Sequence, residues 1–233
     1  MFASPSQDFV YVRTYSRWIE DLKRRETWDE TVERYITFIE NERGGTIPSK
    51  VIKKMRKAVL DLDVMPSMRA LWAAGKAASR DNTCMYNCSF LAADSIASFA
   101  ECLYILMCGT GVGFSVEKKY VNKLPAVPTI TAEGVGVHII SDDKKGWAES
   151  LKILMQSLYK GKDIQFDYTQ IRPKGAKLKV MGGRASGPEP LIKLHLFVRE
   201  VFNNAQGRKL TTLECHDIMN EIAEIVVVGG VRR

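Results

Sequence analysis

The stretch that decides the fold is DSIASFAECLYILMCGTGVGFSV, residues 94–116. Its first part, residues 94–107, is mostly apolar, which predicts a helix that is buried on most sides. Residues 112–116, VGFSV, are rich in β-branched and aromatic side chains, which is typical of a strand. A helix that leads through a glycine turn into a strand indicates an α/β protein.

Helical spacing ahead of this stretch predicts a helical N-terminal region. Thr27 and Glu30 form a capping-box pattern at the start of one helix. A second helix begins at Ser49, with these apolar residues at helical spacing: Ile52, Met55, Val59 and Leu62. The proline-broken segment that follows, VMPSMRALWAAG, does not have the pattern of a regular helix. We therefore place a boundary after residue 62 and expect a helical region over residues 1–62.

Helices and strands alternate in the remainder. A helix over residues 143–161 is followed by residues 163–168, DIQFDY, which alternate like a strand. A further helix begins near Pro190, and Thr211 and Glu214 form a capping pattern at the start of a last helix. This order predicts an α/β domain with mainly parallel strands over residues 63–233. The chain stops in VVVGGVRR, and we expect a missing segment or a partner chain to continue this domain.

The composition is that of an ordinary globular chain. Of its 233 residues, 45% are hydrophobic and 26% are charged. No apolar run approaches the roughly 18 to 20 residues that span a bilayer, and the start, MFASPSQDFVYVRTYSRW, lacks the features of a signal peptide. Five scattered cysteines argue against a secreted disulfide scaffold. We therefore expect a cytoplasmic protein with mostly free thiols and no membrane partner.

The chain is basic, with a net charge of +7 and a pI of about 9.1. Such a charge either favours solubility only or attracts phosphate-bearing ligands. The second helix carries a basic run: Lys50, Lys53, Lys54, Arg56 and Lys57. A solvated surface is the simpler interpretation of this run. A non-catalytic, basic nucleic-acid-binding protein that uses this helix is the alternative function.

Two glycine-rich segments could approach a phosphate group. Residues 108–114, CGTGVGF, have the order helix, glycines, strand, which is the reverse of the dinucleotide-binding fingerprint. A tight turn is therefore the simpler interpretation of these glycines. Residues 182–188, GGRASGP, form a loop that could either fold around a nucleotide or be a plain surface loop.

The cysteines do not predict a metal site. Cys84 and Cys88 lack the spacing of a zinc-ligand pair, and no second pair or histidine cluster completes a tetrahedral set. Cys102, Cys108 and Cys215 fall in or beside apolar helices, where buried thiols are expected. Cys88 stands between aromatic residues ahead of a helix. On these residues alone, an inert buried thiol is its simpler interpretation.

Taken together, stretches of this chain resemble ribonucleotide reductases: RTYSRWIEDLKRRETWDETVERY, MPSMRALWAAG, NCSF, GTGVGFSV, FDYTQIRPKGA, GGRASGP and VVVGGVRR. Each is weak alone, but together they follow the family's order from about Arg13 to Arg233. The chain is most similar to class II, the adenosylcobalamin-dependent reductases. This resemblance implies an oxidoreductase that converts ribonucleotides to deoxyribonucleotides for DNA replication, by thiyl-radical chemistry with a redox cysteine pair.

The resemblance also implies roles for particular residues. Cys88 corresponds to the N-terminal thiol of the redox pair, on the first strand of a ten-stranded α/β barrel. Ser67, Asn87 and Gly111 correspond to positions that contact the substrate, and Asp94 to an acidic residue that binds an effector nucleotide. The loop that links the effector to substrate choice corresponds to Gly182, Gly183, Arg184, Ala185 and Ser186. Effector and substrate sites linked in this way would be coupled allosterically.

Other parts of the family pattern lie beyond this chain. The radical cysteine, the second redox cysteine and the cobalamin-binding region follow VRR in the family, so this N-terminal portion should be inactive alone. The complete enzyme would bind adenosylcobalamin, a ribonucleotide, a deoxynucleotide or ATP effector, a thioredoxin-like reductant and the downstream fragment.

One further expectation concerns the oligomeric form of the enzyme, and one concerns an alternative function. Short linkers from NCSF to GTGVGF and on to KKGW predict that the chain lacks the insertion of monomeric class II enzymes, which favours a homodimer. A regulatory nucleotide-binding fragment without catalysis is a further alternative to the function of a reductase.

Overall fold

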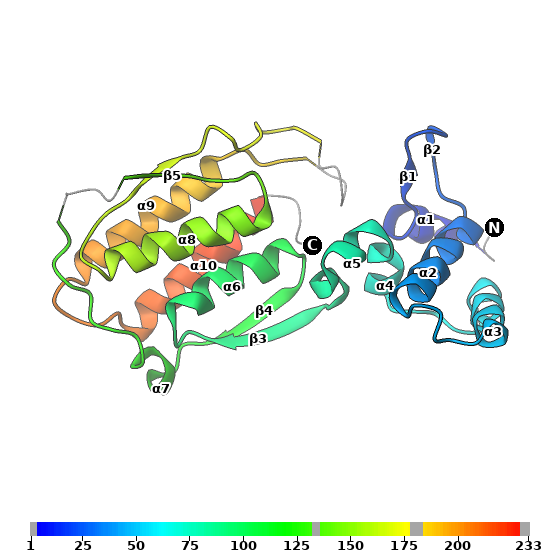
Figure 1. Cartoon of the computed structure of the whole chain (residues 1–233), viewed down its shortest axis with the longest axis horizontal. Coiled ribbons are helices and arrows are strands. Elements are labelled where there is room, and N and C mark those ends of the chain that lie inside the picture. Colours follow the sequence, from blue (N-terminus) through cyan, green and yellow to red (C-terminus); the bar gives the residue numbers. More distant parts are fainter. Residues whose placement is uncertain (1–3, 132–135, 178–183, 229–233) are drawn as a thin grey trace. The chain divides into compact units, whose positions relative to one another are not determined.

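The protein divides into two compact units. The structure is a computed structural model that describes residues 4–131, 136–177 and 184–228. The N-terminal unit comprises Met1–Tyr86 and the C-terminal unit comprises Asn87–Arg233. Figure 1 labels most of the helices and strands of both.

The N-terminal unit is mainly helical, as predicted. Its elements in chain order are α1 (Pro5–Thr14), β1 (Trp18–Ile19), β2 (Arg24–Arg25), α2 (Trp28–Glu42), α3 (Ser49–Leu60), α4 (Met68–Ala73), α5 (Lys76–Arg80) and the 3₁₀ helix η1 (Asn82–Met85). β1 and β2 form an antiparallel pair. α2 and α3 pack against each other. Their contact is a small apolar core whose central side chains are at most 4% exposed: Val32, Ile36, Ile52 and Val59.

The predicted start of α2 is confirmed. The Glu30 amide donates a hydrogen bond to Thr27 Oγ1 over 3.3 Å, and the Thr27 amide donates to the Glu30 carboxylate over 2.7 Å. The pair provides acceptors for backbone donors at the helix start that the helix itself leaves open.

The apolar face of α3 is shorter than predicted. Ile52 and Val59 are each 4% exposed, and Met55 packs against them. Leu62, which was expected to continue this face, is 47% exposed and has a φ of +62°. The helix ends at Leu60, and the left-handed backbone at Leu62 takes its side chain out of the helical register.

The boundary between the compact units follows Tyr86, later in the chain than the boundary that the sequence pattern predicts after residue 62. The intervening segment, where no regular helix was expected, contains the short helices α4 and α5. Arg34 of α2 donates to the carbonyl oxygens of Leu71 and Ala74 over 2.8 and 3.1 Å. These bonds hold α4 against α2 and therefore make it part of the N-terminal unit.

The C-terminal unit is α/β. Its elements are β3 (Cys88–Ala92), α6 (Ile96–Met107), β4 (Gly111–Ser115), α7 (Lys118–Val121), β5 (Val137–Ile139), α8 (Lys144–Leu158), β6 (Gln165–Asp167), α9 (Glu189–Asn204) and α10 (Thr212–Val228). β3 pairs with β4 and β5 pairs with β6, both in parallel, which confirms the predicted α/β class. None of the helices in the described part has the length and apolarity that crossing a bilayer requires.

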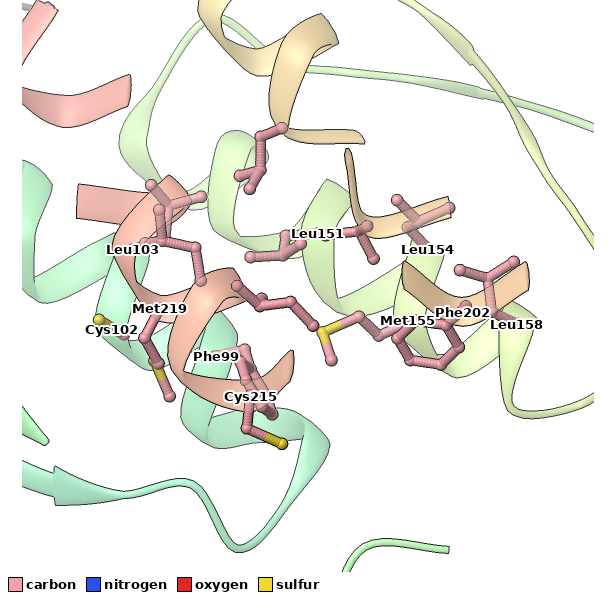
Figure 2. Close-up of a cluster of buried hydrophobic side chains, with 14 of the residues drawn as sticks. Phe99, Cys102, Leu103, Leu151, Leu154, Met155, Leu158, Phe202, Cys215 and Met219 are labelled. Atoms are coloured by element: carbon pink, nitrogen blue, oxygen red, sulfur yellow. The ribbon is translucent and has the colours of Figure 1, made fainter. Parts of the chain in front are cut away.

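The core of this unit lies among its long helices. α6 packs against α8 and α10, α9 packs against α8 and α10, and α6 also contacts β3 and β4 (Figure 1). Figure 2 shows the side chains that meet there, and those it labels are at most 1% exposed: Phe99, Cys102, Leu103, Leu151, Leu154, Met155, Leu158, Phe202, Cys215 and Met219. Burial of these side chains fixes the position of α6 and of the strands that it contacts.

The predicted helix over residues 143–161 is α8, with Asp143 as its N-cap. Asp143 Oδ1 accepts a hydrogen bond from the Gly146 amide over 2.8 Å. A Cβ atom on Gly146 would lie 2.4 Å from the backbone oxygen of Ser141, so this first turn requires glycine. The helix ends at Leu158, three residues before the predicted Gly161, which has a φ of +74° and turns the chain away from the helix.

Candidate active site

β3 and β4 bring Asn87, Cys88 and Gly111 together. Cys88 lies beside Gly111 in the parallel register, and Phe90 lies beside Gly113. The Gly111 amide donates a hydrogen bond to the Asn87 carbonyl oxygen over 2.8 Å. Three residues to which the resemblance assigned a role therefore occupy adjacent positions at the start of one strand pair.

One face of this strand pair is packed and the other is open. Side chains alternate along a strand: Leu91 and Val112 pack against the core of the unit, whereas Cys88 and Phe90 are exposed. Phe90 is 67% exposed. Gly111, the register partner of Cys88, has no side chain that could cover the sulfur on that flank. The arrangement leaves Cys88 accessible to a ligand on the open face.

Cys88 differs from the other cysteines in exposure. All five are free thiols, and the remaining ones are at most 1% exposed: Cys84, Cys102, Cys108 and Cys215. The buried thiols predicted at Cys102, Cys108 and Cys215 are thus confirmed. Burial raises the pKa of Cys215 to about 12, so its thiol stays protonated. Cys88 alone among the cysteines is open to a dissolved reactant.

We expect one fast-reacting thiol per chain. A soluble aromatic disulfide such as dithionitrobenzoate should modify Cys88 in the folded protein, and the four buried thiols only after unfolding in guanidinium chloride. Cys88→Ser should remove the fast phase, measured by the released chromophore, and Cys84→Ser should keep it. Persistence of the fast phase in Cys88→Ser would identify a different accessible thiol.

Ser67 lies in the N-terminal unit, whereas Cys88 lies in the C-terminal unit. It is the exposed N-cap of α4, and its Oγ accepts a hydrogen bond from the Ala70 amide over 3.1 Å. A hydroxyl that accepts in this way still has its own proton to donate. The cap therefore leaves Ser67 able to donate a hydrogen bond to a ligand.

Asp94 lies between β3 and α6, one residue before the Ser95 N-cap. Its carboxylate pairs with Lys123 over 2.9 Å and accepts a hydrogen bond from Ser98 Oγ over 3.4 Å. The hydrogen bond from Lys123 lowers the pKa of Asp94, which favours the ionised carboxylate. α6 begins at Ile96, slightly later than the predicted start at Asp94, because the Ser95 side chain provides the cap.

The predicted specificity loop is described in part. Gly182 and Gly183 lie outside the described residues. The remaining members are Arg184, which is exposed, and Ala185 and Ser186, which are half-buried. The Gly175 amide donates to the Ala185 carbonyl oxygen over 2.9 Å, and Arg184 Nη1 donates to the Gly175 carbonyl oxygen over 2.9 Å. Antiparallel backbone pairing thus joins residues 175–177 to residues 184 and 185.

The sequence did not predict a group of hydrogen-bonded polar side chains around a buried histidine. His195 is fully buried, with Nε2 3.2 Å from Ser150 Oγ and Nδ1 2.8 Å from Tyr168 Oη. Burial, with a smaller contribution from Arg199, lowers the pKa of His195 to about 3. Helical spacing could have predicted the burial of His195. It lies four residues after the buried Leu191 on α9, and therefore on the apolar face of that helix.

Two family models match this chain. The model of the ribonucleotide reductase alpha domain matches residues 3–76. The model of the insertion domain of B12-dependent ribonucleotide reductase matches residues 117–202. The two matched segments fall in different compact units.

Curated relatives match almost the whole chain. The adenosylcobalamin-dependent ribonucleoside-triphosphate reductase of Euglena gracilis is 31% identical over 97% of this chain and 34% of its own length. The enzymes of that name from Lactobacillus leichmannii and Levilactobacillus brevis are 30% and 28% identical, each over 96% of this chain and 39% of its own length. The chain therefore spans between a third and two-fifths of these relatives.

A solved structure agrees with these matches. A crystal structure of B12-dependent (class II) ribonucleotide reductase superposes with a TM-score of 0.82 at 29% identity, covering 94% of this chain and 40% of that chain. Sequence and fold together place this chain in the ribonucleotide reductase family. Within that family it matches the adenosylcobalamin-dependent enzymes of class II, as the resemblance implied.

One expectation about the form of the enzyme is wrong. The chain was expected to lack the class II insertion, but the insertion-domain model matches residues 117–202. The short linkers therefore give no ground for predicting a homodimer.

Proposed function

We propose that this chain provides the N-terminal part of an adenosylcobalamin-dependent ribonucleotide reductase, and that Cys88 is one of the two thiols that reduce the substrate. The observation that carries the proposal is the position of Cys88, an exposed thiol on an open strand face beside a glycine. The relatives are ribonucleoside-triphosphate reductases by name, which favours triphosphates as substrates.

The proposed chemistry needs two thiols. Replacing the ribose 2′-hydroxyl by hydrogen breaks one C–O bond, releases water and consumes two electrons and two protons. Cys88 and a second cysteine from outside this chain supply them by closing to a disulfide. A thioredoxin-like dithiol then reopens that disulfide by thiol–disulfide exchange. The radical that starts the reaction belongs, by the resemblance, to a third cysteine outside this chain.

β3 and β4 serve as the first strands of the family's barrel in this proposal. A parallel pair of two strands leaves unpaired backbone donors and acceptors at its edges and is marginally stable alone. Additional strands from the rest of the enzyme would satisfy these groups and would enclose the open face that carries Cys88. Enclosure protects radical chemistry from side reactions with water.

The substrate and effector contacts form the second part of the proposal. Gly111 allows close approach of a ribose, Asn87 flanks the same position, and Ser67 donates its free hydroxyl proton to the substrate. Asp94 accepts from a ribose hydroxyl of the effector, while its partner Lys123 attracts a phosphate. The segment that contains Arg184 communicates the occupancy of that effector site to the substrate site.

The cofactor requires residues other than those described. Two cavities of the described part have volumes of about 510 and 300 Å³, and both are lined by residues of the N-terminal unit. Such volumes suit ligands of drug size or less, and adenosylcobalamin is much larger. Neither of these two cavities therefore fits this cofactor, and we assign none of their residues to holding it.

Reconstitution tests the proposed function. This chain, joined to or mixed with the segment that follows the matched region in its class II relatives, should form deoxyribonucleoside triphosphate from ATP, CTP, GTP or UTP. The reaction should need adenosylcobalamin and a dithiol, and neither fragment should react alone. An assembled, cofactor-binding complex that forms no deoxyribonucleotide would contradict the proposal.

A further inference from the structure

An apolar groove lies along α3 in the N-terminal unit. It has a volume of about 300 Å³, and its apolar lining comes from α2, α3 and the turn that follows α3: Tyr35, Val51, Met55, Ala58, Val64 and Pro66. No step of the proposed reductase reaction uses these residues.

Several apolar side chains in and near the groove are exposed. Val51 and Val64, which line it, are 45% and 57% exposed. Leu62 and Met65, which lie two residues before and one residue after Val64 in the sequence, are 47% and 50% exposed. Exposed apolar surface of this kind marks interaction sites in soluble proteins, and methionine adapts its shape to different partners.

The rim of the groove is basic. Lys54 lines it, and Lys50 lies one helical turn earlier on α3. Lys50, Lys53 and Lys54 are exposed, and no ion pair with another described residue involves them. By contrast, Arg56 and Lys57 of the same helix pair with acidic side chains of the unit. Of these lysines, Lys54 therefore places an unpaired positive charge at the groove, with Lys50 next to it along the helix.

Lys50 occupies the unfavourable end of α3, in its first turn. The N-terminus of a helix carries a partial positive charge, so a cation there destabilises the helix and an anion stabilises it. The first turn of α3 has no acidic residue, and its N-cap, Pro48, makes no side-chain capping bond. The charge of Lys50 thus weakens α3 in the free chain, and a carboxylate from a partner would compensate for it.

We propose that this groove binds an acidic amphipathic helix of a partner protein. Apolar side chains at positions i, i+3 or i+4, and i+7 of that helix would enter the groove between Val51 and Val64. Glutamate or aspartate side chains beside them would pair with Lys50 and Lys54. Charge complementarity of this kind sets the choice of partner and the rate of association. The proposal does not depend on the reductase reaction.

A peptide titration against the full chain tests this interaction. The probe is a fluorescein-labelled helix of about 16 residues with leucine at the i, i+3, i+4 and i+7 positions and glutamate on both flanks, long enough to form helix on binding. A second peptide replaces every glutamate by lysine, and a third is a scrambled sequence of the first. Fluorescence anisotropy gives the dissociation constants, at low and at high salt.

The glutamate peptide should bind at least about tenfold more tightly than the lysine and scrambled peptides, and salt should weaken it. Val64→Asp and Lys54→Glu should each weaken it about tenfold, because both lie at the groove. The matched controls are Val10→Asp on α1, where the side chain is 51% exposed, and Lys152→Glu on α8; each should stay within about twofold.

Three results would overturn the proposal. These are equal binding of the glutamate and lysine peptides, unchanged affinity in both groove variants, and displacement of the glutamate peptide by an equal concentration of short duplex DNA. The last would assign the basic rim to nucleic acid. Val64 and Lys54 are both exposed, so circular dichroism should show each variant folded; if Val64→Asp unfolds, Lys54→Glu decides.

Discussion

Cys88→Ser is expected to lower deoxyribonucleotide formation by the assembled reductase at least ~10³-fold, since in the proposed reaction it removes one member of a group of residues that act as a unit. A serine hydroxyl fits the same position on β3, and the neighbouring Gly111 leaves room for it. It cannot form a disulfide, however, and therefore cannot deliver electrons to the ribose. Product formation should be measured by chromatography of the nucleotides, with dithiothreitol as the reductant.

Cys84→Ser is the matched control for this prediction. It makes the same change of atom four residues earlier, at a thiol that is 1% exposed and donates to the Asp81 carbonyl oxygen over 3.2 Å. A serine hydroxyl can donate the same bond, so activity should stay within about threefold. If Cys88→Ser kept full activity with a small dithiol, Cys88 would have no part in substrate reduction.

The second large effect concerns stability at acidic pH. His195 has a pKa of about 3 in the folded protein, against 6.5 for the ordinary side chain. Between these values the unfolded chain binds a proton at this position and the folded chain does not. Stability contributed by neutral His195 is therefore complete only well above pH 6.5 and is lost as the pH falls toward 3. The slope approaches about 1.4 kcal/mol per pH unit between the two pKa values, and the loss between pH 6.5 and 4.5 is about 2.3 kcal/mol.

Urea unfolding of the wild-type chain and of His195→Gln across that interval measures this contribution. The variant should be less stable at pH 7, because Ser150 and Tyr168 lose their buried partner. Between pH 6.5 and 4.5, the free energy of unfolding of His195→Gln should therefore fall less than that of the wild type. The difference should equal the contribution of His195 over that interval. His216→Gln is the control, because that side chain is 46% exposed on α10. Equal slopes in wild type and His195→Gln would show that His195 takes up its proton in the folded protein.

Sequence reasoning succeeded where a structure is set by neighbours along the chain. The α10 start is an example: the Glu214 amide donates to Thr211 Oγ1 over 3.1 Å, and the Thr211 amide donates back to the Glu214 carboxylate over 2.8 Å. Both partners lie within three residues, so the pattern is visible in a short window. The end of α3 was placed too late, because spacing alone does not show the left-handed backbone at Leu62.

Cys88 shows where residue patterns were insufficient. Considered alone, it had the simpler interpretation of a buried, inert thiol, and only the order of several motifs along the chain indicated a reductase. Its exposure depends on strand pairing with Gly111, 23 residues away, and on which face of that pair the core covers. A short stretch of sequence around Cys88 shows neither its strand partner nor the face that the core covers.

The amino-acid sequence by itself determined the helix starts, the α/β class and, through the order of its motifs, the ribonucleotide reductase family. Only the tertiary structure decided that α4 belongs to the N-terminal unit, that His195 is a buried neutral base, and that Cys88 is the accessible thiol. The reason is physical. Caps and helical faces arise from hydrogen bonds and contacts between residues three or four apart. Burial and exposure instead depend on every element that packs around a side chain.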